Sequence, residues 1–306
     1  MMKILMISGD KQLLNPESDA GKRLTLMRAE VDQLDVFVWP QVHSWWQIFQ
    51  AARGTDYNII TAQDPFFRGV LAWKLTWITR AKLNVQVHAD LQGQSLFRHM
   101  LAQIMLRHAD SVRVVSEKLR AQVQSYGVTC PIRVLPVYVD LERFARILPL
   151  EHAQKTILWI GRFEPEKAPL EALRALRQVR GQGVDARLIM LGQGSLEGVL
   201  RKEAEGMPVE FPGWGDPATY LPTADVVLCT SLNESWGASI VEALAAGVPV
   251  VAPDVGIARE AGAIVVAREQ LGKAVARVLR DGGRSVLKLS LPSAREWAQE
   301  WRKTLV

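Results

Sequence analysis

Two stretches in the second half of the chain combine charged side chains with glycine in a pattern that suits a diphosphate ligand. The first is Gly161-Arg-Phe-Glu-Pro-Glu-Lys167, a loop that follows an apolar run and places Arg162 and Lys167 five residues apart. An arginine can hold a phosphate through a bidentate fork, and a lysine attracts it as a point charge. This loop therefore predicts a pair of cations that neutralise a diphosphate.

The second stretch, Asn233-Glu-Ser-Trp-Gly-Ala-Ser-Ile-Val-Glu242, places a polar, glycine-containing loop in front of a predicted helix. The first N–H groups of a helix lack backbone partners and attract anions, so a phosphate can bind over Ser235 to Ala238. Glu234 would then precede the helix and Glu242 would lie inside it. Both carboxylates would be placed to accept hydrogen bonds from sugar hydroxyls.

Other phosphate and metal chemistries are not supported by the sequence. Gly21-Lys22 is followed by Arg23 where a Walker A motif needs Ser or Thr, and no Gly-x-Gly-x-x-Gly follows the first predicted strand. There is no Asp-x-Asp, and the five histidines form no His-Glu-x-x-His pair. P-loop ATPases, simple NAD dehydrogenases and metal-dependent enzymes are therefore disfavoured.

The composition is that of a folded, soluble protein. The 306 residues are 48% hydrophobic and 23% charged, and their number favours two domains over one. Cys130 and Cys229 stand far apart, so they predict neither a disulfide framework nor a thiolate zinc site, and a cytoplasmic setting is expected. No apolar run approaches the ~20 residues of a membrane span, and the N-terminal run is too short for an export signal.

The net positive charge belongs to the first half of the chain. Residues 1–146 hold 18 Lys and Arg against 13 Asp and Glu, whereas residues 147–306 hold 19 of each. This asymmetry suits an anionic partner, such as a phospholipid surface or a phosphate-bearing acceptor, although proteins without such partners also show it. The aromatic and basic segment 66–82 fits an inter-strand helix packed on a sheet as well as it fits a membrane-surface helix.

Short Val-, Ile- and Leu-rich runs alternate with helical patterns along both halves, which is typical of parallel sheets covered by helices. The predicted strands are Lys3–Ser8, Asp35–Trp39, Tyr57–Thr61, Asn84–His88, Ser111–Val115, Ile132–Leu135, Thr156–Ile160, Ala186–Leu191, Val209–Phe211, Asp225–Cys229, Val248–Ala252 and Ala263–Val266. Helices of the second half are predicted near Pro169–Arg180, Ser195–Glu205, Gly237–Ala246 and Arg268–Arg280. The sequence thus predicts an α/β protein with two Rossmann-like, doubly wound domains that face each other across a ligand-binding cleft.

We place these domains at residues 1–146 and 147–288, joined near Phe144–Glu151, where Pro149 interrupts the pattern. Residues 289–306 contain a further predicted helix with Trp297 and Trp301 on one face. This helix is either an ordinary terminal helix or one that crosses back to the N-terminal domain.

These residues resemble a known family, the retaining glycosyltransferases of family 4, whose members have the two-domain glycosyltransferase-B (GT-B) fold. The resemblance is strongest over the block from Glu234 to Ala252, and it covers most of the chain. Further similar blocks, in the same order as in the family, are Gln63–Phe66, Gln86–Asp90, Val134–Asp140, the Arg162 and Lys167 loop, Leu191–Gly194 and Phe211–Gly215.

The resemblance implies a donor site in the second half. Arg162 and Lys167 would neutralise the diphosphate of the donor, Glu242 would bind ribose hydroxyls, and Glu234 would act on the transferred sugar as a catalytic residue. The donor would also be bound by Ser235, Trp236, Gly237, Ala238, Gly213 and Trp214.

In the first half, the resemblance implies the acceptor side and a second catalytic residue. His88, at the end of a predicted strand, would face the transferred sugar. Gly9 and Asp90 would lie on the acceptor side. Family members often carry a Gly-Gly loop after the first strand, whereas this chain has Gly9-Asp10-Lys11, so the acceptor geometry is the part least transferable to it.

The leading functional hypothesis is therefore a metal-independent, retaining glycosyltransferase of polysaccharide or glycolipid assembly, with a nucleotide diphosphate-sugar as co-substrate and no other cofactor. Its partners would be the donor, a glycan or lipid-linked acceptor and, through the basic N-terminal half, the inner face of a membrane. No nucleic-acid partner is expected. Two alternatives stay open: a nucleotide-sugar epimerase of the same fold, and a non-catalytic sugar-nucleotide-binding protein.

Overall fold

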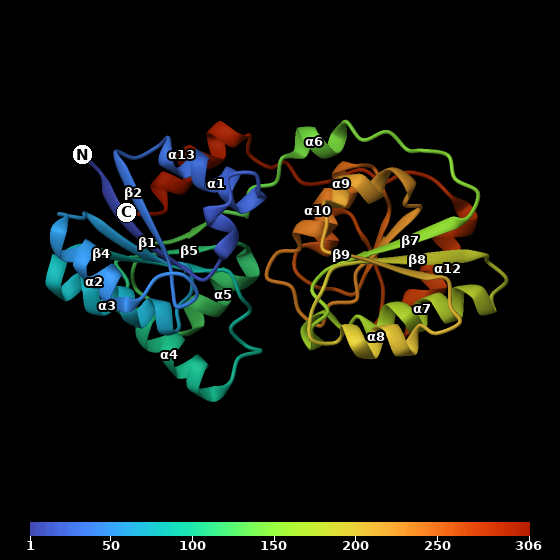
Figure 1. Cartoon of the computed structure of the whole chain (residues 1–306), viewed down its shortest axis with the longest axis horizontal. Coiled ribbons are helices and arrows are strands. Elements are labelled where there is room, and N and C mark those ends of the chain that lie inside the picture. The colour runs from blue at the N-terminus through green and yellow to red at the C-terminus, as the bar shows by residue number, and fades with distance from the viewer. The chain divides into compact units, whose positions relative to one another are not determined.

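The apolar runs and their helices form two separate α/β units in the computed structural model, which describes residues 1–306 (Figure 1). The first unit comprises Met1–Tyr138 together with Pro292–Val306, and the second comprises Val139–Leu291. The first unit is thus built from both ends of the chain, and the red C-terminal helix of Figure 1 lies among blue elements.

A six-stranded parallel sheet forms the centre of the first unit, in the order β2-β1-β3-β4-β5-β6. Its strands are β1 (Lys3–Ser8), β2 (Gln33–Val38), β3 (Ile59–Ala62), β4 (Lys82–Val87), β5 (Ser111–Val114) and β6 (Ile132–Val134). Its helices are η1 (Lys11–Leu14), α1 (Asp19–Arg28), α2 (Trp45–Gly54), α3 (Phe67–Thr79), α4 (Leu96–Arg107), α5 (Glu117–Ser125) and α13 (Ala294–Lys303). Because helices cover both faces of the sheet, its central strands are buried. Strands β1 and β3 are mostly apolar, whereas β4 and β5 alternate apolar residues with buried polar ones such as Asn84, Gln86 and Arg113.

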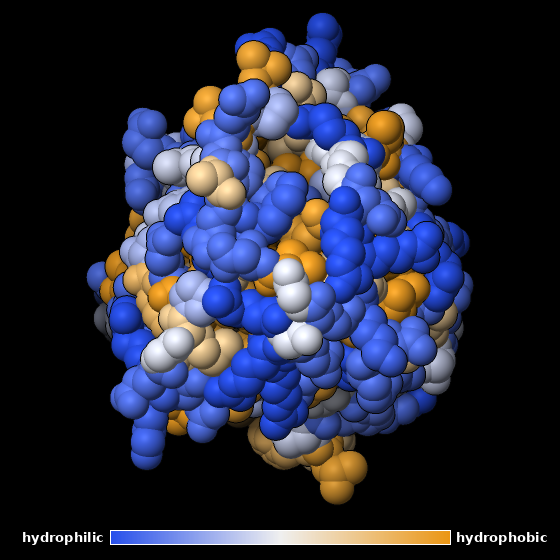
Figure 2. Space-filling model, turned by 90° about the vertical axis from the view of Figure 1, so that its right-hand side faces the viewer, coloured by the Kyte–Doolittle hydropathy of each residue, from blue (hydrophilic) through white to orange (hydrophobic).

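The second unit repeats this plan with the strand order β12-β11-β10-β7-β8-β9. Its strands are β7 (Lys155–Ile160), β8 (Ala186–Leu191), β9 (Val209–Gly213), β10 (Val226–Leu228), β11 (Val250–Ala252) and β12 (Ile264–Val265). Its helices are α6 (Leu141–Ala145), η2 (Pro165–Lys167), α7 (Leu170–Gly181), α8 (Glu197–Glu203), α9 (Pro217–Tyr220), η3 (Leu221–Thr223), α10 (Ala238–Ala245), α11 (Ala258–Ala261), η4 (Arg268–Gln270) and α12 (Leu271–Asp281). Figure 2 shows that the end of this unit is mostly hydrophilic, with small, separate hydrophobic areas.

All twelve predicted strands are present, and the predicted α/β, doubly wound architecture is confirmed in both units. The division of the chain differs from the predicted one. The first unit ends after Tyr138 rather than at residue 146, because α6 packs against α10 of the second unit and buries Phe144. At the other end, the first unit resumes at Pro292, so the helix predicted within residues 289–306 is one that returns to the N-terminal domain.

The C-terminal helix α13 completes the core of the first unit. Trp297 and Trp301 are buried on one face of this helix, in the same cluster as Ile4 and Met6 of β1. The Trp297 indole donates a hydrogen bond of 2.8 Å to the carbonyl oxygen of Pro136. Helix α13 also packs against α1, so it is part of the first unit's architecture. None of the helices combines the length and the apolar character that a membrane crossing needs.

Candidate functional site

In the second unit, the two motif loops meet at the carboxyl ends of neighbouring strands. Strands β7 and β10 are adjacent, with β8 and β9 on one side and β11 and β12 on the other, so the winding direction changes between them. In doubly wound sheets the crevice at such a switch point is the usual ligand site. The Arg162 loop follows β7 and the Glu234 loop follows β10, so both loops lie at this switch point, the expected crevice of the second unit.

An ion pair between Lys167 Nζ and Glu234 Oε1 joins the two loops. Both side chains are largely buried, with 20% and 13% of their surfaces exposed. The Ser231 hydroxyl donates a hydrogen bond of 2.7 Å to the same Glu234 oxygen. The carboxylate is therefore fixed in place, and an anion that binds at Lys167 shares the ammonium group with Glu234.

Arg162 is the more exposed cation of the loop. Its Nη2 lies 2.7 Å from Glu166 Oε1, and 61% of its side chain is exposed. An exposed pair of this kind contributes little to stability. The guanidinium can therefore exchange Glu166 for a phosphate with little loss of folding free energy.

Helix α10 begins at the crevice with Gly237 as its N-cap residue. Gly237 has a φ of 105°, in the left-handed region that favours glycine, and it offers no side chain to cap the first N–H groups. Trp236 is 3% exposed, and its carbonyl oxygen accepts a hydrogen bond of 3.0 Å from the Ile257 N–H, so both its side chain and its backbone anchor the loop. Ser235, Ala238 and Glu242 are all half-buried, with Glu242 in the middle of the helix. This helix start can attract an anion.

The loop after β11 holds the Glu234 segment in position. A Cβ atom on Gly256 would lie 2.3 Å from the Trp236 carbonyl oxygen and 2.9 Å from the Glu234 Cβ. Only a residue without a side chain allows this approach. The two loops therefore pack backbone to backbone behind Glu234.

Glycines of the β8 and β9 loops approach the Arg162 loop closely. A Cβ atom on Gly192 would lie 1.8 Å from the Gly161 carbonyl oxygen, and one on Gly194 would clash with the Phe163 backbone. Gly213 ends β9 with a φ of 85°, and the next residue, Trp214, is 62% exposed. These glycines bring the ends of β7, β8 and β9 together beside an exposed indole ring.

The sequence interpretation missed the residues that support the two loops. The Trp159 indole donates to Thr230 Oγ1 at 2.8 Å, and the Thr230 hydroxyl donates to the Lys167 carbonyl oxygen, also at 2.8 Å. Arg268 donates to the carbonyl oxygens of Thr230 and Ser231. The polar pair Thr230-Ser231 directly after an apolar strand is the one signal that could have indicated this role.

In the first unit, a cavity of about 400 Å³ opens at the carboxyl ends of the strands. It lies where the winding direction changes between β1 and β3, with Gly9 following β1 and Gln63 following β3. The guanidinium of Arg68 packs against Gly9, where a Cβ atom would lie 2.2 Å from Arg68 Nη2. His88, after β4, also lines the cavity, so the structure brings the predicted Gly9 and His88 together.

The His88 imidazole is neutral at physiological pH. Its Nε2 lies 3.4 Å from Gln86 Oε1. Burial, and then the positive charges of Arg113 and Arg23, lower the pKa of His88 to about 3. A histidine with so low a pKa is a weak base, so it acts through hydrogen bonds rather than by taking up a proton.

Asp90 is not among the residues that line this cavity. Its carboxylate accepts hydrogen bonds from the Gln92 N–H at 2.9 Å and from the Gln122 amide at 3.1 Å. Lys118 Nζ lies 3.4 Å from its other oxygen. Asp90 therefore ties the loop after β4 to helix α5 instead of facing the cavity with His88.

Curated relatives of the chain include two mannosyltransferases. The GDP-mannose-dependent alpha-(1-6)-phosphatidylinositol dimannoside mannosyltransferase of Mycobacterium tuberculosis is 32% identical over 154 residues, which are 46% of this chain and 40% of that protein. The phosphatidyl-myo-inositol mannosyltransferase of Mycobacterium leprae is 36% identical over 254 residues, which are 79% of this chain and 62% of that protein. The chain spans less than two thirds of either relative.

Among solved structures, sucrose-phosphate synthase from Thermosynechococcus elongatus resembles the whole chain, with a TM-score of 0.72, 20% identity, and coverage of 100% of this chain and 94% of that one. This likeness concerns the fold and confirms the predicted GT-B architecture. Residues 12–143 match the model of Glycosyltransferase Family 4, and residues 154–281 match that of Glycosyl transferases group 1. With both of its units matched, the chain belongs to the group 1 glycosyltransferases of family 4.

Proposed function

We propose that this protein transfers a sugar, with retention of configuration, from a nucleotide diphosphate-sugar to a glycan or lipid-linked acceptor. The observation that carries the proposal is the pair of loops at the β7 and β10 switch point, where Lys167 and Glu234 are joined beside the start of α10. The relatives support it, because the M. tuberculosis protein is named as a GDP-mannose-dependent mannosyltransferase.

The proposed mechanism stabilises the departing diphosphate with protein charges. Breaking the bond between sugar and phosphate leaves extra negative charge on the diphosphate. Arg162, Lys167 and the N–H groups at the start of α10 present positive charge at one crevice, and such preorganised groups lower the barrier to charge separation. We propose that these groups suffice without a metal ion or other cofactor.

The carboxylates of the crevice bind the rest of the donor. Glu242, half-buried in α10, would accept hydrogen bonds from ribose hydroxyls, and Glu234 would orient the transferred sugar. The exposed Trp214 ring beside Gly213 offers a flat apolar surface to the nucleotide. In the first unit, neutral His88 would hydrogen-bond a substrate hydroxyl, and Gly9 would border the acceptor.

A panel of UDP-, GDP- and ADP-sugars tests the proposal directly. The matching donor should raise the unfolding temperature, because a ligand that binds only the folded state stabilises it. Chelation with EDTA should leave that shift and the turnover unchanged. No shift with any donor, or a shift that EDTA removes, would contradict the proposed metal-free donor site.

Product analysis separates this function from the two alternatives. A transferase releases nucleoside diphosphate and needs an acceptor or water. An epimerase converts the donor without an acceptor and releases no diphosphate. A non-catalytic binding protein shifts in unfolding temperature but leaves the donor unchanged with every acceptor.

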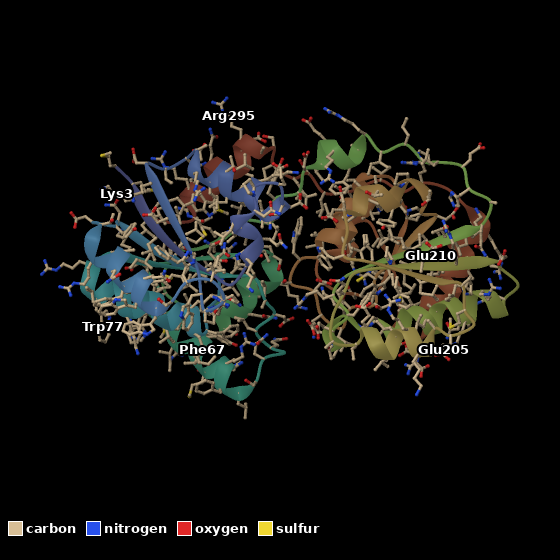
Figure 3. All side chains as sticks on the ribbon, viewed as in Figure 1. Lys3, Phe67, Trp77, Glu205, Glu210 and Arg295 are labelled. Atoms are coloured by element: carbon tan, nitrogen blue, oxygen red, sulfur yellow. The ribbon has the colours of Figure 1, made fainter.

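We also propose that the first unit contacts the inner face of a membrane, through apolar side chains of α3 and α4. These side chains, the α3–α4 apolar surface, are Phe67, Trp77, Leu96, Phe97 and Met100, which are between 51% and 91% exposed. The Phe67 and Phe97 ring centroids lie 6.1 Å apart, and Figure 3 shows Phe67 and Trp77 at the periphery of the unit. Exposed Lys74 and Arg107 on the same helices favour an anionic membrane.

A further inference from the structure

Arg113 is a buried cation whose hydrogen bonds all go to neutral groups. It lies on β5, is 2% exposed, and lines the cavity of the first unit. Its guanidinium donates to Gln86 Oε1 at 3.0 Å and to the carbonyl oxygens of Leu135 and Pro136 at 3.1 to 3.3 Å. A buried charge is normally paired with an opposite charge. None of the groups that accept hydrogen bonds from Arg113 carries a negative charge.

The other charges around the cavity leave it positive. Arg23, Arg68 and Arg98 line it together with Arg113, whereas the acidic lining residues are only Asp10 and Asp64. Asp64 is already paired with Arg68, through Arg68 Nη1 at 2.5 Å. Arg98 Cζ lies 4.1 Å from the centre of the Phe66 ring, which holds the side chain at the cavity. The cavity is thus lined by four arginines but by only two carboxylates.

From these residues we infer that the cavity of the first unit binds a phosphate ester group, and that this group belongs to the acceptor. The assignment to an acceptor rests on the proposed function, whereas phosphate binding does not. The exposed Arg98 can offer its fork to two phosphate oxygens, whereas Arg113 already makes four hydrogen bonds to protein oxygens and would act mainly through its charge, which a phosphate would balance. At about 400 Å³ the cavity is larger than a phosphate needs, so it also accommodates part of the molecule that carries the phosphate.

The phosphate can come from a lipid headgroup or from a water-soluble ester. Phe66 lines the cavity and the next residue, Phe67, belongs to the α3–α4 apolar surface, so apolar side chains border the site. Both sources share the phosphate ester chemistry, and the experiment has to separate them.

Calorimetry with sn-glycerol 3-phosphate tests the site in the full chain without any donor. The wild type should bind it, and should not bind glycerol at the same concentration. Arg113→Met should weaken binding at least tenfold. Arg133→Met is the matched control, because Arg133 is the register neighbour of Arg113 on β6, is exposed, does not line the cavity, and its replacement changes the net charge equally.

A second variant guards against a folding defect in Arg113→Met. Arg98→Met changes an exposed residue of α4 and should also weaken binding several-fold in a folded protein. Equal loss in Arg113→Met, Arg98→Met and Arg133→Met, or no binding by the wild type to either phosphate source, would overturn the inference. Loss of binding in Arg162→Ala with normal binding in Arg113→Met would also overturn it, because the phosphate would then occupy the crevice of the second unit.

Vesicles identify the source of the phosphate. Phosphatidylcholine vesicles with phosphatidic acid should bind the wild type and Arg133→Met more tightly than Arg113→Met if the ester is a lipid headgroup. Binding of sn-glycerol 3-phosphate without this difference would support the site and assign a soluble ester. If phosphate binds but no donor sugar is ever transferred or hydrolysed, the proposed function fails while the phosphate site stands.

Discussion

At the residue scale, the crevice of the second unit works with cations that already have partners. Lys167 is paired with Glu234 in a largely buried contact, and Arg162 with Glu166 in an exposed one. A diphosphate therefore competes with a carboxylate for each cation. Competition is easier at Arg162, because water replaces its contact with Glu166 at little loss.

Arg162→Ala should weaken binding of a nucleoside diphosphate by about 1.5 kcal/mol, near the lower end of the ~1.5–3 kcal/mol typical of hydrogen bonds to charged groups. The expected effect is small because a diphosphate that binds Arg162 also breaks the ion pair between Arg162 and Glu166. Calorimetry gives the affinity. Arg201→Ala is the control, because Arg201 makes the same kind of exposed pair, 2.8 Å from Glu197 on α8, away from the crevice. Equal affinities for wild type and Arg162→Ala would move the diphosphate elsewhere.

The low pKa of His88 predicts a pH-dependent penalty on folding. Unfolded His88 takes up a proton below pH ~6.5, whereas the folded residue, with its pKa lowered to about 3, does not. Between these values the unfolded state binds more protons, so the contribution of His88 to stability falls as the pH falls. From pH 7 to pH 5 the free energy of unfolding of the wild type should fall by on the order of 1–2 kcal/mol relative to that of His88→Gln.

Urea unfolding of both proteins at pH 7 and pH 5 measures this difference, since carboxylates common to both proteins cancel. His152 serves as a control, because its contribution to the free energy of unfolding should change with pH in the opposite direction. Its hydrogen bond to Asp225, at 2.8 Å, raises its pKa, so its contribution is present at low pH and is lost as the pH rises through the raised pKa. A constant gap between wild type and His88→Gln would show that His88 titrates normally in the folded protein.

The role of His88 in the proposed reaction predicts a separate kinetic effect. His88→Ala should lower turnover far more than it weakens donor affinity, because interactions made mainly in the transition state appear in kcat. Steady-state kinetics with an identified acceptor, together with donor calorimetry, separate the two. Parallel losses of kcat and donor affinity would assign His88 to ground-state binding instead.

Single residues could be predicted where the chemistry lies in their type. Arg162, Lys167 and Glu234 lie in the loops that follow two predicted strands, so their placement at the carboxyl edge of a sheet followed from the sequence. Arg113 could not be predicted, because it lies within a strand rather than in a loop, and only the three-dimensional arrangement shows that its partners are neutral. Asp90 is the opposite case. Its position near His88 in the sequence suggested a place at the site, whereas its hydrogen bonds hold the loop after β4.

At the element scale, glycines set how closely the loops of the crevice pack. Gly256→Ala should destabilise the second unit by roughly 1–3 kcal/mol, because its Cβ would lie 2.3 Å from the Trp236 carbonyl oxygen and its φ of 53° is strained for alanine. Donor affinity should fall as well, since Glu234 is displaced. Gly198→Ala in α8 meets no atom within 4 Å and should stabilise by about 0.5–1 kcal/mol. Urea unfolding checks both variants.

The proposed membrane contact of the α3–α4 apolar surface can be tested by substitutions on that surface. Leu96→Ser combined with Phe97→Ser should reduce binding to vesicles with anionic lipid several-fold, without loss of stability, because both side chains are more than half exposed. Leu148→Ser is the control, as Leu148 is 77% exposed in the second unit. Sedimentation with vesicles measures the binding. Unchanged binding of the double variant would exclude this surface as the membrane contact.

The elements themselves could largely be predicted, because buried parallel strands leave continuous apolar runs in the sequence. Element partners were harder to predict. The sequence gives no sign that α6 packs on α10, since a five-residue helix has too little periodicity to reveal its buried face. For α13, the spacing of Trp297 and Trp301 predicted an apolar face but left open which unit it covers.

At the scale of the whole molecule, each unit has its own hydrophobic core. Trp301 is 0% exposed in the cluster of the first unit, and Trp159 is 2% exposed in that of the second. The C-terminal segment supplies part of the first core although it follows the second unit in sequence. The two units therefore depend on different tryptophans, and only the second contains the proposed donor crevice.

This separation predicts that two tryptophan substitutions of similar cost to stability differ in their effect on nucleotide affinity. Trp301→Ala should destabilise the first unit by about 3–5 kcal/mol, the usual effect of deleting a large buried aromatic side chain, and should leave nucleoside diphosphate affinity nearly unchanged. Trp159→Ala should destabilise the second unit by a similar amount and weaken the affinity, because the Trp159 indole also holds Thr230, which in turn holds the Lys167 backbone. Calorimetric unfolding with and without nucleotide measures both effects, since nucleotide should raise only the transition of the second unit. A loss of affinity in Trp301→Ala as large as that in Trp159→Ala would show instead that the donor crevice depends on the first unit.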